Sequence, residues 1–286
     1  MTHSSVVNSL LSAYASRLEK AGVDSPALCA RMILGEALGM SRAGLVVYSD
    51  MAVGEAARVA CENMLARREK GEPMAYILGR KEFYGRDFAV RPGVLVPRPE
   101  TELLVELALD RLPLDEKLMF ADFGCGSGCI LVTLLLEARN WRGVGVDISK
   151  SALEVSRETI GVHKVADRAG LLDADFTKNP FQGECLDFIV SNPPYISSED
   201  YKALGFEVKD FEPRLAFESG PEGLDHPRQV VESAGKILKP GGWLFMEIGS
   251  EQGEAAMGLF SGKIWAGPEL VADLAGLDRV AAACKR

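Results

Sequence analysis

This chain of 286 residues has few of the side chains with which proteins bind transition metals or form disulfides. It contains three histidines, which lie far apart, and six cysteines without a CxxC pair. Structural zinc sites and small disulfide-stapled folds both use such residues at short, regular spacing. The sequence therefore predicts neither a metal site nor a disulfide framework, and we expect a reduced, cytoplasmic setting.

Long hydrophobic runs are also missing. No segment reaches the roughly eighteen consecutive apolar residues that a membrane-spanning helix needs. The first twenty residues mix Ser, Asn, Arg, Glu and Lys with short apolar stretches, which is typical of a helix rather than a signal peptide. We therefore expect no membrane partner.

Positive charge is scarce as well, since 32 Lys and Arg stand against 41 Asp and Glu, a net charge of −9. Proteins whose main partner is nucleic acid usually carry a basic surface. Direct binding to nucleic acid is therefore not expected. The length is typical of two domains rather than one.

The pattern of the chain predicts three parts. Residues 1–72 show helical spacing, with Ser25-Pro26 as a helix start, Gly39 as its stop and a further helix from about Val53 to Lys70. We expect these residues to form a small all-helical domain. Residues 73–97, with Phe83-Tyr84-Gly85 and Phe88-Ala89-Val90, predict a linker with a short β-hairpin.

Residues 98–286 predict an α/β domain. A helix is expected over Glu100–Leu112, and short apolar runs then alternate with helical stretches, which is typical of a parallel sheet covered by helices on both faces. Near the end, two adjacent strands joined by a loop predict an antiparallel closure of the sheet. The other strand candidates are Leu118–Phe123, Gly143–Asp147, Leu186–Ser191 and Trp243–Ile248.

The most informative motif is Asn192-Pro193-Pro194-Tyr195, which directly follows an apolar run. The Asn192 side chain offers a carbonyl oxygen to N–H donors, while the prolines hold the chain extended and donate no hydrogen bond from their own nitrogens. The Tyr195 ring adds a flat wall. Such a motif at the end of a strand is suited to grip a planar NH2 group, although an ordinary Asn-Pro turn has the same residues.

A second motif, Asp122-Phe123-Gly124-Cys125-Gly126-Ser127-Gly128, joins a predicted strand to a predicted helix. Its glycines allow a ligand to approach the backbone closely. Asp147 ends the next predicted strand, where a carboxylate accepts hydrogen bonds from ribose hydroxyls. Each feature alone has a plain structural explanation, a tight turn or a helix cap. Together they indicate a cofactor that carries adenosine.

Nicotinamide dinucleotides and S-adenosylmethionine both carry adenosine. The glycine spacing here is GxGxG rather than the GxGxxG that cradles a pyrophosphate. This spacing, the antiparallel closure and the motif at Asn192 favour S-adenosylmethionine. Phe176, in Asp173-Ala174-Asp175-Phe176, is placed either to border the adenine ring, with a carboxylate near the adenine amine, or to belong to the core.

With these motifs in this order, the chain resembles the HemK/PrmC family of S-adenosylmethionine-dependent methyltransferases, and the resemblance covers nearly the whole chain. The Asn192 motif alone is shared with DNA adenine methyltransferases, so the block from Glu72 to Glu102 points to this family. The chain departs from the family's more common residues at Phe123, Cys125 and Phe176. The matching segments are Glu72–Gly79, Glu82–Gly85, Pro97–Glu102, Phe211–Pro213, Gly223–Asp225 and Asp273–Gly276.

The resemblance implies a Rossmann-like class I methyltransferase fold. We expect the helical domain to dock the protein substrate, because a glutamine in a glycine-rich loop offers few contacts for recognition; a lid or a stabilising appendage is the alternative role. It implies methylation of the N5 side-chain amide of the glutamine in the Gly-Gly-Gln motif of peptide chain release factors, and we expect a monomer. The residues implied to bind the cofactor are Gly124, Cys125, Gly126, Ser127, Gly128, Asp147, Phe176 and Asn192. The residues implied to bind the glutamine are Asn192, Pro193, Pro194 and Tyr195, with Asn192, Pro193 and Tyr195 active in catalysis.

Two other functions stay open at this point. The amine of adenine is also a planar NH2 group, so an N6-adenine methyltransferase acting on DNA or RNA is an alternative. The acidic composition and the lack of an evident target-reading domain oppose it. A cofactor-binding protein that methylates nothing is the third possibility, which an intact motif beside an intact glycine loop disfavours.

Overall fold

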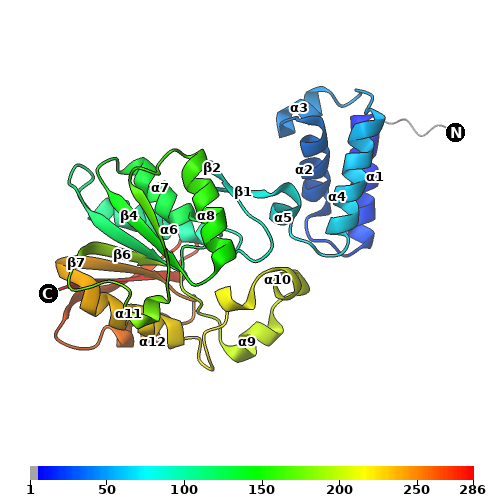
Figure 1. The fold of residues 1–286 in the computed structure, drawn as a ribbon. Coiled ribbons are helices and arrows are strands. Elements are labelled where there is room, and N and C mark those ends of the chain that lie inside the picture. The colour runs from blue at the N-terminus through cyan, green and yellow to red at the C-terminus, as the bar shows by residue number, and fades with distance from the viewer. Residues whose placement is uncertain (1–5) are drawn as a thin grey trace. The chain divides into compact units, whose positions relative to one another are not determined.

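The computed structural model describes residues 6–286. Residues 1–5, with His3 and the start of the first expected helix, lie outside the described part. The chain divides into two compact units, one ending at Gly79 and the other spanning Arg80–Arg286 (Figure 1). Within the described residues, none of the helices combines the length and the apolar character that crossing a membrane requires.

The first unit is helical, as expected. Pro26 stands in the first turn of the second helix, and Gly39 ends that helix with a left-handed φ of 62°, which glycine adopts without steric cost. The two helices predicted in this region are therefore confirmed. The helices are α1 Val7–Lys20, α2 Pro26–Leu38, α3 Arg42–Val47, α4 Glu55–Arg68 and α5 Met74–Leu78.

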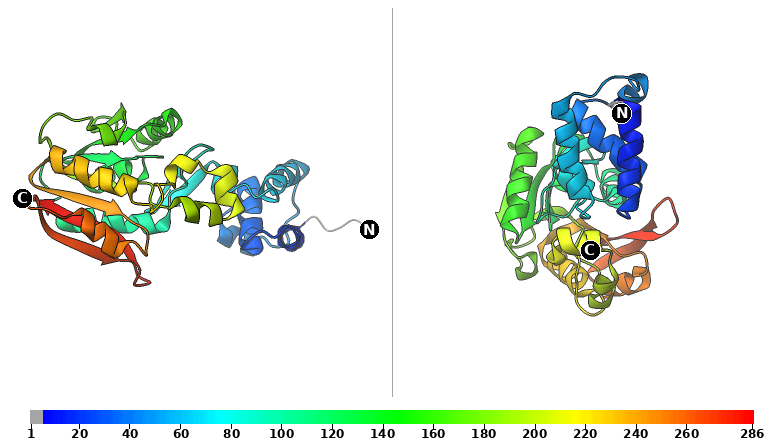
Figure 2. Two further views of the ribbon diagram at one scale, coloured as in Figure 1. Left: turned by 90° about the horizontal axis from the view of Figure 1, so that it is seen from below. Right: turned by 90° about the vertical axis from the view of Figure 1, so that its right-hand side faces the viewer.

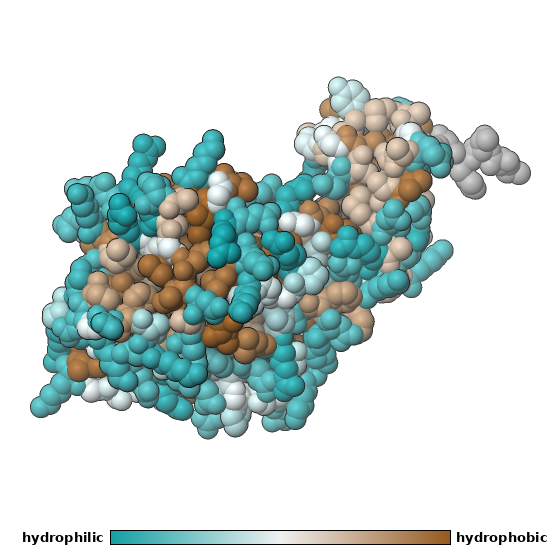
Figure 3. Space-filling model, in the orientation of Figure 1, coloured by the Kyte–Doolittle hydropathy of each residue, from teal (hydrophilic) through white to brown (hydrophobic). Residues whose placement is uncertain are grey.

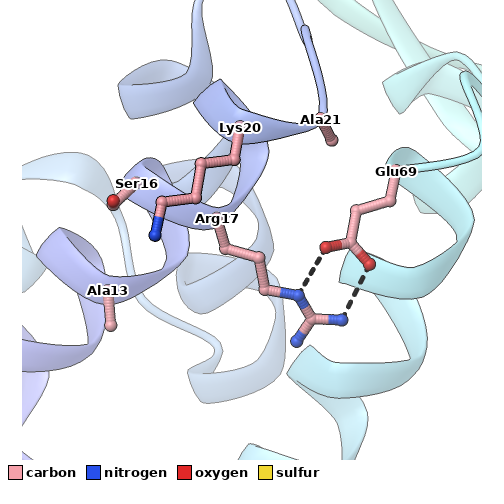
Figure 4. Close-up of a pocket in the computed structure, with 6 residues that line it drawn as sticks. All are labelled: Ala13, Ser16, Arg17, Lys20, Ala21 and Glu69. Carbon is pink, nitrogen blue, oxygen red and sulfur yellow. Dashed lines mark hydrogen bonds and ion pairs between the residues drawn. The ribbon is translucent and has the colours of Figure 1, made fainter.

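Helices α1, α2 and α4 lie side by side in all the views and enclose a core of their own (Figures 1 and 2). This core includes Leu18, Ile33, Leu34 and Leu65, all of which are fully buried. On the surface of this unit is a hollow in which Arg17 faces Glu69 (Figure 4). Arg17 Nη2 donates to Glu69 Oε2 over 2.8 Å, and the same guanidinium also pairs with Glu62. Its charge is thus already neutralised within the unit.

The expected linker of residues 73–97 is divided between the two units. Helix α5 belongs to the first unit, where Met74 packs against the helical core. The expected hairpin is present as β1 Arg80–Phe83 and β2 Arg86–Ala89, and it belongs to the second unit. Its residues Phe83 and Phe88 are buried in the core of that unit. The expected boundaries at residues 72 and 97 therefore differ from the observed division, because each half of this segment buries its apolar side chains in a different core.

The second unit is built on a seven-stranded sheet with the order β5-β4-β3-β6-β7-β9-β8. Neighbouring strands from β5 to β7 are parallel, and β9 pairs antiparallel with both β7 and β8. The predicted parallel sheet with an antiparallel closing strand is therefore confirmed. The strands are β3 Met119–Phe123, β4 Arg142–Asp147, β5 Ala169–Asp173, β6 Leu186–Ser191, β7 Leu238–Glu247, β8 Trp265–Ala272 and β9 Asp278–Lys285.

Helices cover both faces of this sheet (Figure 1). Alternate residues along each strand enter different cores, as the period of two in a strand requires. Phe120 and Phe188 face one core, with α6 Glu102–Arg111, α7 Cys129–Glu137 and α8 Lys150–Val162. Ala121 and Ile189 face the other core, with α11 Asp225–Ile237 and α12 Gly253–Leu259.

Gly143, near the start of β4, has no room for a side chain. A Cβ atom there would lie 2.5 Å from Cζ of Phe120 and 2.6 Å from Cδ1 of Leu131, and both of these residues are fully buried. We expect Gly143→Ala to lower the free energy of unfolding by about 1–3 kcal/mol, because the core has to shift. Urea denaturation followed by circular dichroism measures this effect.

Gly161→Ala in α8 is the matched control, since a Cβ atom there would meet open space. We expect it to leave the stability unchanged or to raise it by up to about 1 kcal/mol. An equal loss of stability in both variants would contradict this description of the core.

The segment between β6 and α11 was not predicted as helical. It forms α9 Ser198–Ala203, α10 Phe206–Phe211 and a short 3₁₀ turn, η3 Arg214–Ala216. A similar turn, η1 Pro99–Thr101, precedes α6, and η2 Phe176–Lys178 follows β5. These short elements matter because they bring side chains to the edge of the sheet where the parallel strands end.

Candidate active site

A pocket of about 370 Å³ lies at the carboxyl ends of the parallel strands. The register pairs Phe123 with both Val146 and Ser191, so the loops after β3, β4 and β6 start at the same edge. The strand order also reverses between β3 and β6, which is where open α/β sheets bind ligands. The lining residues from these loops, and from the turn after β5, are Gly124–Ser127, Asp147–Ser149, Asp175–Thr177, Asn192 and Pro194.

The glycine loop forms the floor of this pocket. Gly124 and Gly126 have φ angles of 73° and 55°, which side-chain-bearing residues rarely adopt. The loop is held to the neighbouring strand because the N–H groups of Gly124 and Cys125 both donate to the Val146 carbonyl, over 2.8 and 3.2 Å. Burial raises the pKa of the Cys125 thiol well above its usual range, so this side chain stays neutral.

Asp147 lies where the sequence placed it, at the end of β4 beside the glycine loop. Its Oδ2 accepts the Gly126 N–H over 3.0 Å, and its Oδ1 accepts the Ser149 N–H over 2.9 Å. Burial raises the pKa of Asp147, while these two backbone N–H groups lower it. A carboxylate has about four acceptor positions. Asp147 therefore fastens the loop and still has acceptor positions for a ligand in the pocket.

Phe176 lines the pocket and is also part of the core. Its ring stacks on Phe123 with the centroids 5.4 Å apart and the planes inclined by 10°. The nearby Asp175 carboxylate caps η2, since its Oδ1 accepts the N–H of Thr177. Phe176 therefore fits both predicted positions. One face of its ring packs on Phe123 in the core, and the residue also lies at the edge of the pocket.

The Asn192 motif starts one residue after β6 ends. Asn192 Nδ2 donates to Oγ1 of Thr101 over 3.0 Å, which leaves the side-chain oxygen of Asn192 as its acceptor group. The Tyr195 hydroxyl donates to Oε1 of Glu247 over 3.2 Å. Asn192 and Pro194 line the pocket. The amide of Asn192 is therefore held in one orientation by a residue that is 91 positions away in the sequence.

A glutamine fixes the backbone of the motif from outside the pocket. Gln252 Nε2 donates to the Tyr195 carbonyl over 2.8 Å, and its Oε1 accepts the N–H of Gly249 over 3.0 Å. Neither Gln252 nor Thr101 was predicted from the sequence to be part of the site. Thr101 lies in the segment Pro97–Glu102, which resembles the family, so the sequence held a clue to its role. Gln252 lies in no such segment.

The rim of the pocket is formed by two segments that are far apart in the sequence. Glu212, in the segment after α10, is buried; its Oε1 accepts from Arg98 and its Oε2 accepts the Val96 N–H over 3.0 Å. This contact joins the loop before η1 to the loop before η3. Two lining residues, Ile148 and Leu215, are 48% and 53% exposed. Hydrophobic surface is visible among the hydrophilic residues of this unit in Figure 3.

The structure brings most of the predicted site residues together. Three of them do not line the pocket: Gly128, Pro193 and Tyr195. Gly128 caps α7 with a φ of 78°, and a Cβ atom there would lie 3.0 Å from Oγ of Ser156, so it shapes the loop from behind. Pro193 is buried, and Tyr195 is partly buried with its hydroxyl on Glu247. The predicted residues that do line it are Gly124, Cys125, Gly126, Ser127, Asp147, Phe176, Asn192 and Pro194.

The residues of the pocket fit S-adenosylmethionine. A small polar ligand with an adenosine part needs a glycine cradle, a carboxylate for its ribose and an aromatic or apolar wall for its base. Gly124 and Gly126 are placed to form such a cradle, Asp147 to offer the carboxylate and Phe176 to form the wall, and all four line one pocket. The volume lies in the range of small-molecule sites.

Known proteins match the chain in both units. A family model described as the PrmC N-terminal domain matches residues 9–79, and one described as the methyltransferase small domain matches residues 99–206. The release factor glutamine methyltransferase of Nitratidesulfovibrio vulgaris is 43% identical over 97% of this chain and 95% of that protein. The release factor glutamine methyltransferase of Geobacter sulfurreducens is 40% identical over 92% of this chain and 91% of that protein. The crystal structure of a protein-(glutamine-N5) methyltransferase (release factor-specific) from Alicyclobacillus acidocaldarius is 28% identical, with a TM-score of 0.41, over 70% of this chain and 99% of that chain.

Proposed function

Because the chain belongs to the release factor glutamine methyltransferase family, we propose that it methylates the glutamine of the Gly-Gly-Gln motif in peptide chain release factors, at the N5 atom of the side-chain amide. S-adenosylmethionine is the methyl donor. The observation that carries this proposal is the orientation of Asn192. Its Nδ2 donates to Thr101, so its oxygen is the group available to a planar NH2 in a pocket shared with the glycine loop.

The chain's own residues bind and aim the two reactants. Gly124–Ser127, Asp147 and Phe176 would hold the cofactor, with Gly128 shaping the loop behind them, and the cofactor would supply a methyl group on a positively charged sulfur. The Asn192 side-chain oxygen and the Pro193 carbonyl accept the two N–H groups of the glutamine amide and align its nitrogen with that methyl group. Pro194 borders the amide, and the Tyr195 ring packs on its plane. Because Pro193 and Tyr195 do not line the pocket in this structure, their contacts to the amide are proposed to form when the glutamine binds.

Alignment and charge stabilisation are the main contributions of this site. An amide nitrogen is a weak nucleophile because its lone pair is delocalised into the carbonyl. Formation of the new N–C bond would be balanced by cleavage of the bond between the methyl group and sulfur, whose electron pair stays on the sulfur, and positive charge would grow on the nitrogen. The hydrogen bonds to Asn192 and Pro193 would therefore strengthen in the transition state. By analogy with an oxyanion-hole donor, each is worth about 2.7–4 kcal/mol. The extra proton then leaves to water, so no side chain has to act as a general base.

The helical unit is proposed to dock the protein substrate. A glutamine in a short glycine-rich loop offers few contacts for recognition, so a second surface has to supply specificity. The match of residues 9–79 to the PrmC N-terminal domain supports this role. Because its substrate is a translation factor, we place the enzyme in the cytoplasm and expect it to act as a monomer. The adenine-methylating alternative is not favoured, since the matching relatives are named for release factors.

The proposal is tested by supplying labelled S-adenosylmethionine with three substrates in turn: a release factor, the same factor with its loop glutamine changed to alanine, and duplex DNA. We expect label in the first protein only. Label in the altered factor would show that another residue is modified, and label in DNA would overturn the assignment.

A further inference from the structure

One face of α11 brings polar side chains to the wall of the pocket beside Phe176. His226 and Gln229 line the pocket and stand three residues apart, and Ser233 follows on the same face of the helix. Oγ of Ser233 donates to the Phe176 carbonyl over 3.0 Å. The His226 and Phe176 rings meet edge to face, with their centroids 6.4 Å apart. This face of α11 therefore packs against η2, and His226 lies next to the residue expected to border the adenine base.

The His226 ring is held by one of its two nitrogens. Its Nδ1 lies 3.0 Å from Oγ of Ser219, a fully buried residue, and the same Oγ accepts the backbone N–H of His226 over 2.8 Å. In the part of the chain that the structure describes, the Ser219 hydroxyl has no other acceptor for its proton. The hydroxyl therefore donates to Nδ1, and the proton of the neutral ring resides on Nε2. Burial lowers the pKa of His226 despite the opposite effects of Asp225 and Asp175, so the ring is uncharged at neutral pH.

The other ring nitrogen, Nε2, is free to meet a ligand. Among residues 6–286 no group pairs with it, and it is not enclosed within the protein. Because His226 lines the pocket, its Nε2–H is a donor placed at the pocket wall. A few such polar groups fix the orientation of a small ligand. The ring nitrogens N1, N3 and N7 of adenine accept hydrogen bonds, so the base that Phe176 is expected to border offers matching acceptors.

We propose that His226 recognises the base of S-adenosylmethionine by donating a hydrogen bond from Nε2 to a ring nitrogen of the adenine, with Ser219 fixing the tautomer that makes this possible. Phe176 would border any flat base, whereas His226 adds selection for an acceptor at one position of the base. The inference rests on the proposed function only through its cofactor, because it concerns the same site. It does not depend on which group receives the methyl.

Calorimetric binding of S-adenosylhomocysteine to the full chain tests the inference without turnover. Its 1-deaza, 3-deaza and 7-deaza analogues each replace one ring nitrogen of the adenine by C–H. We expect at least one of them to bind the wild type about 5- to 100-fold more weakly than S-adenosylhomocysteine, because Nε2–H then has no acceptor. In His226→Phe, which keeps a flat ring beside Phe176, this difference should disappear. Differences that are the same in both proteins would overturn the inference, and so would three analogues that all bind the wild type as tightly as S-adenosylhomocysteine.

Two further variants separate recognition of the base from a general loss of structure. Gln229→Ala is the matched control, because Gln229 lines the same pocket from the same face of α11, and it should keep the wild-type difference between the analogues. Ser219→Ala leaves the imidazole in place but frees its tautomer, so the difference should shrink. A difference that is lost in Gln229→Ala, or unchanged in Ser219→Ala, would contradict the proposal.

The tautomer of His226 is measured directly by NMR. Long-range 1H–15N spectra of the free chain, with His226 assigned by its loss in His226→Phe, should show a protonated Nε2 and an unprotonated Nδ1. The opposite tautomer would overturn the inference. None of these measurements uses a methyl acceptor. The expected binding pattern without glutamine methylation would therefore refute the proposed function alone, and methylation without that binding pattern would refute this inference alone.

Discussion

Replacing Asn192 by alanine is expected to lower kcat for glutamine methylation by about 10²–10³-fold, the effect of removing one oxyanion-hole group. The substitution deletes the oxygen that accepts an N–H of the substrate, and this hydrogen bond strengthens as positive charge grows on the nitrogen. Affinity for S-adenosylmethionine should change far less, because the glycine loop and Asp147 remain. Initial rates with saturating cofactor and isothermal titration calorimetry measure the two quantities separately.

Asn140→Ala is the matched control for this change. Asn140 is exposed and its side chain donates to the Asp115 carbonyl, outside the pocket. The methylation rate of the Asn140→Ala variant should equal that of the wild type. Near-normal turnover of Asn192→Ala would remove Asn192 from the mechanism, and an equal loss of rate and of cofactor affinity would assign it to cofactor binding.

Replacing Asp147 by alanine is expected to weaken S-adenosylmethionine binding by about 10- to 100-fold for each hydrogen bond lost to the charged carboxylate. Two causes act together. The ribose loses its acceptor, and the glycine loop loses the contact between Gly126 N–H and Asp147 Oδ2 that holds it at 3.0 Å. Calorimetry measures the dissociation constant directly, and kcat at saturating cofactor should fall much less than the affinity.

Asp173→Ala tests whether position or charge matters. Asp173 stands at the end of β5, next to Asp147 in the sheet register, but it is exposed and does not line the pocket. The two variants therefore remove the same charge from adjacent strand ends. We expect Asp173→Ala to bind the cofactor as the wild type does. Equal losses in both variants would mean that the acidic edge as a whole, rather than Asp147, attracts the ligand.

Much of the second unit follows from local sequence patterns. The apolar runs Leu118–Phe123 and Leu186–Ser191 match β3 and β6 closely because buried parallel strands need continuous apolar residues. The glycine loop and Asp147 were found because their chemistry depends on residues next to a strand end. The short helices α9 and α10 were missed, since six-residue helices show too little periodicity to be recognised.

The support of the site could not be predicted in the same way. Thr101, Glu247 and Gln252 act on residues that are distant in the sequence, so only the tertiary structure reveals their contacts. The structure shows Glu247 buried at the end of β7, a central strand of the sheet. The division of residues 73–97 between two cores also depends on packing that no local pattern expresses.

The most direct test of the central claim is tandem mass spectrometry of a release factor after reaction with this protein and S-adenosylmethionine. We expect a mass increase of one methyl group on the side-chain amide of the glutamine in the Gly-Gly-Gln motif, and none with Asn192→Ala over the same time. A methyl group on another residue of the release factor would contradict the proposed function. An unmodified glutamine after reaction with active wild-type enzyme would contradict it as well.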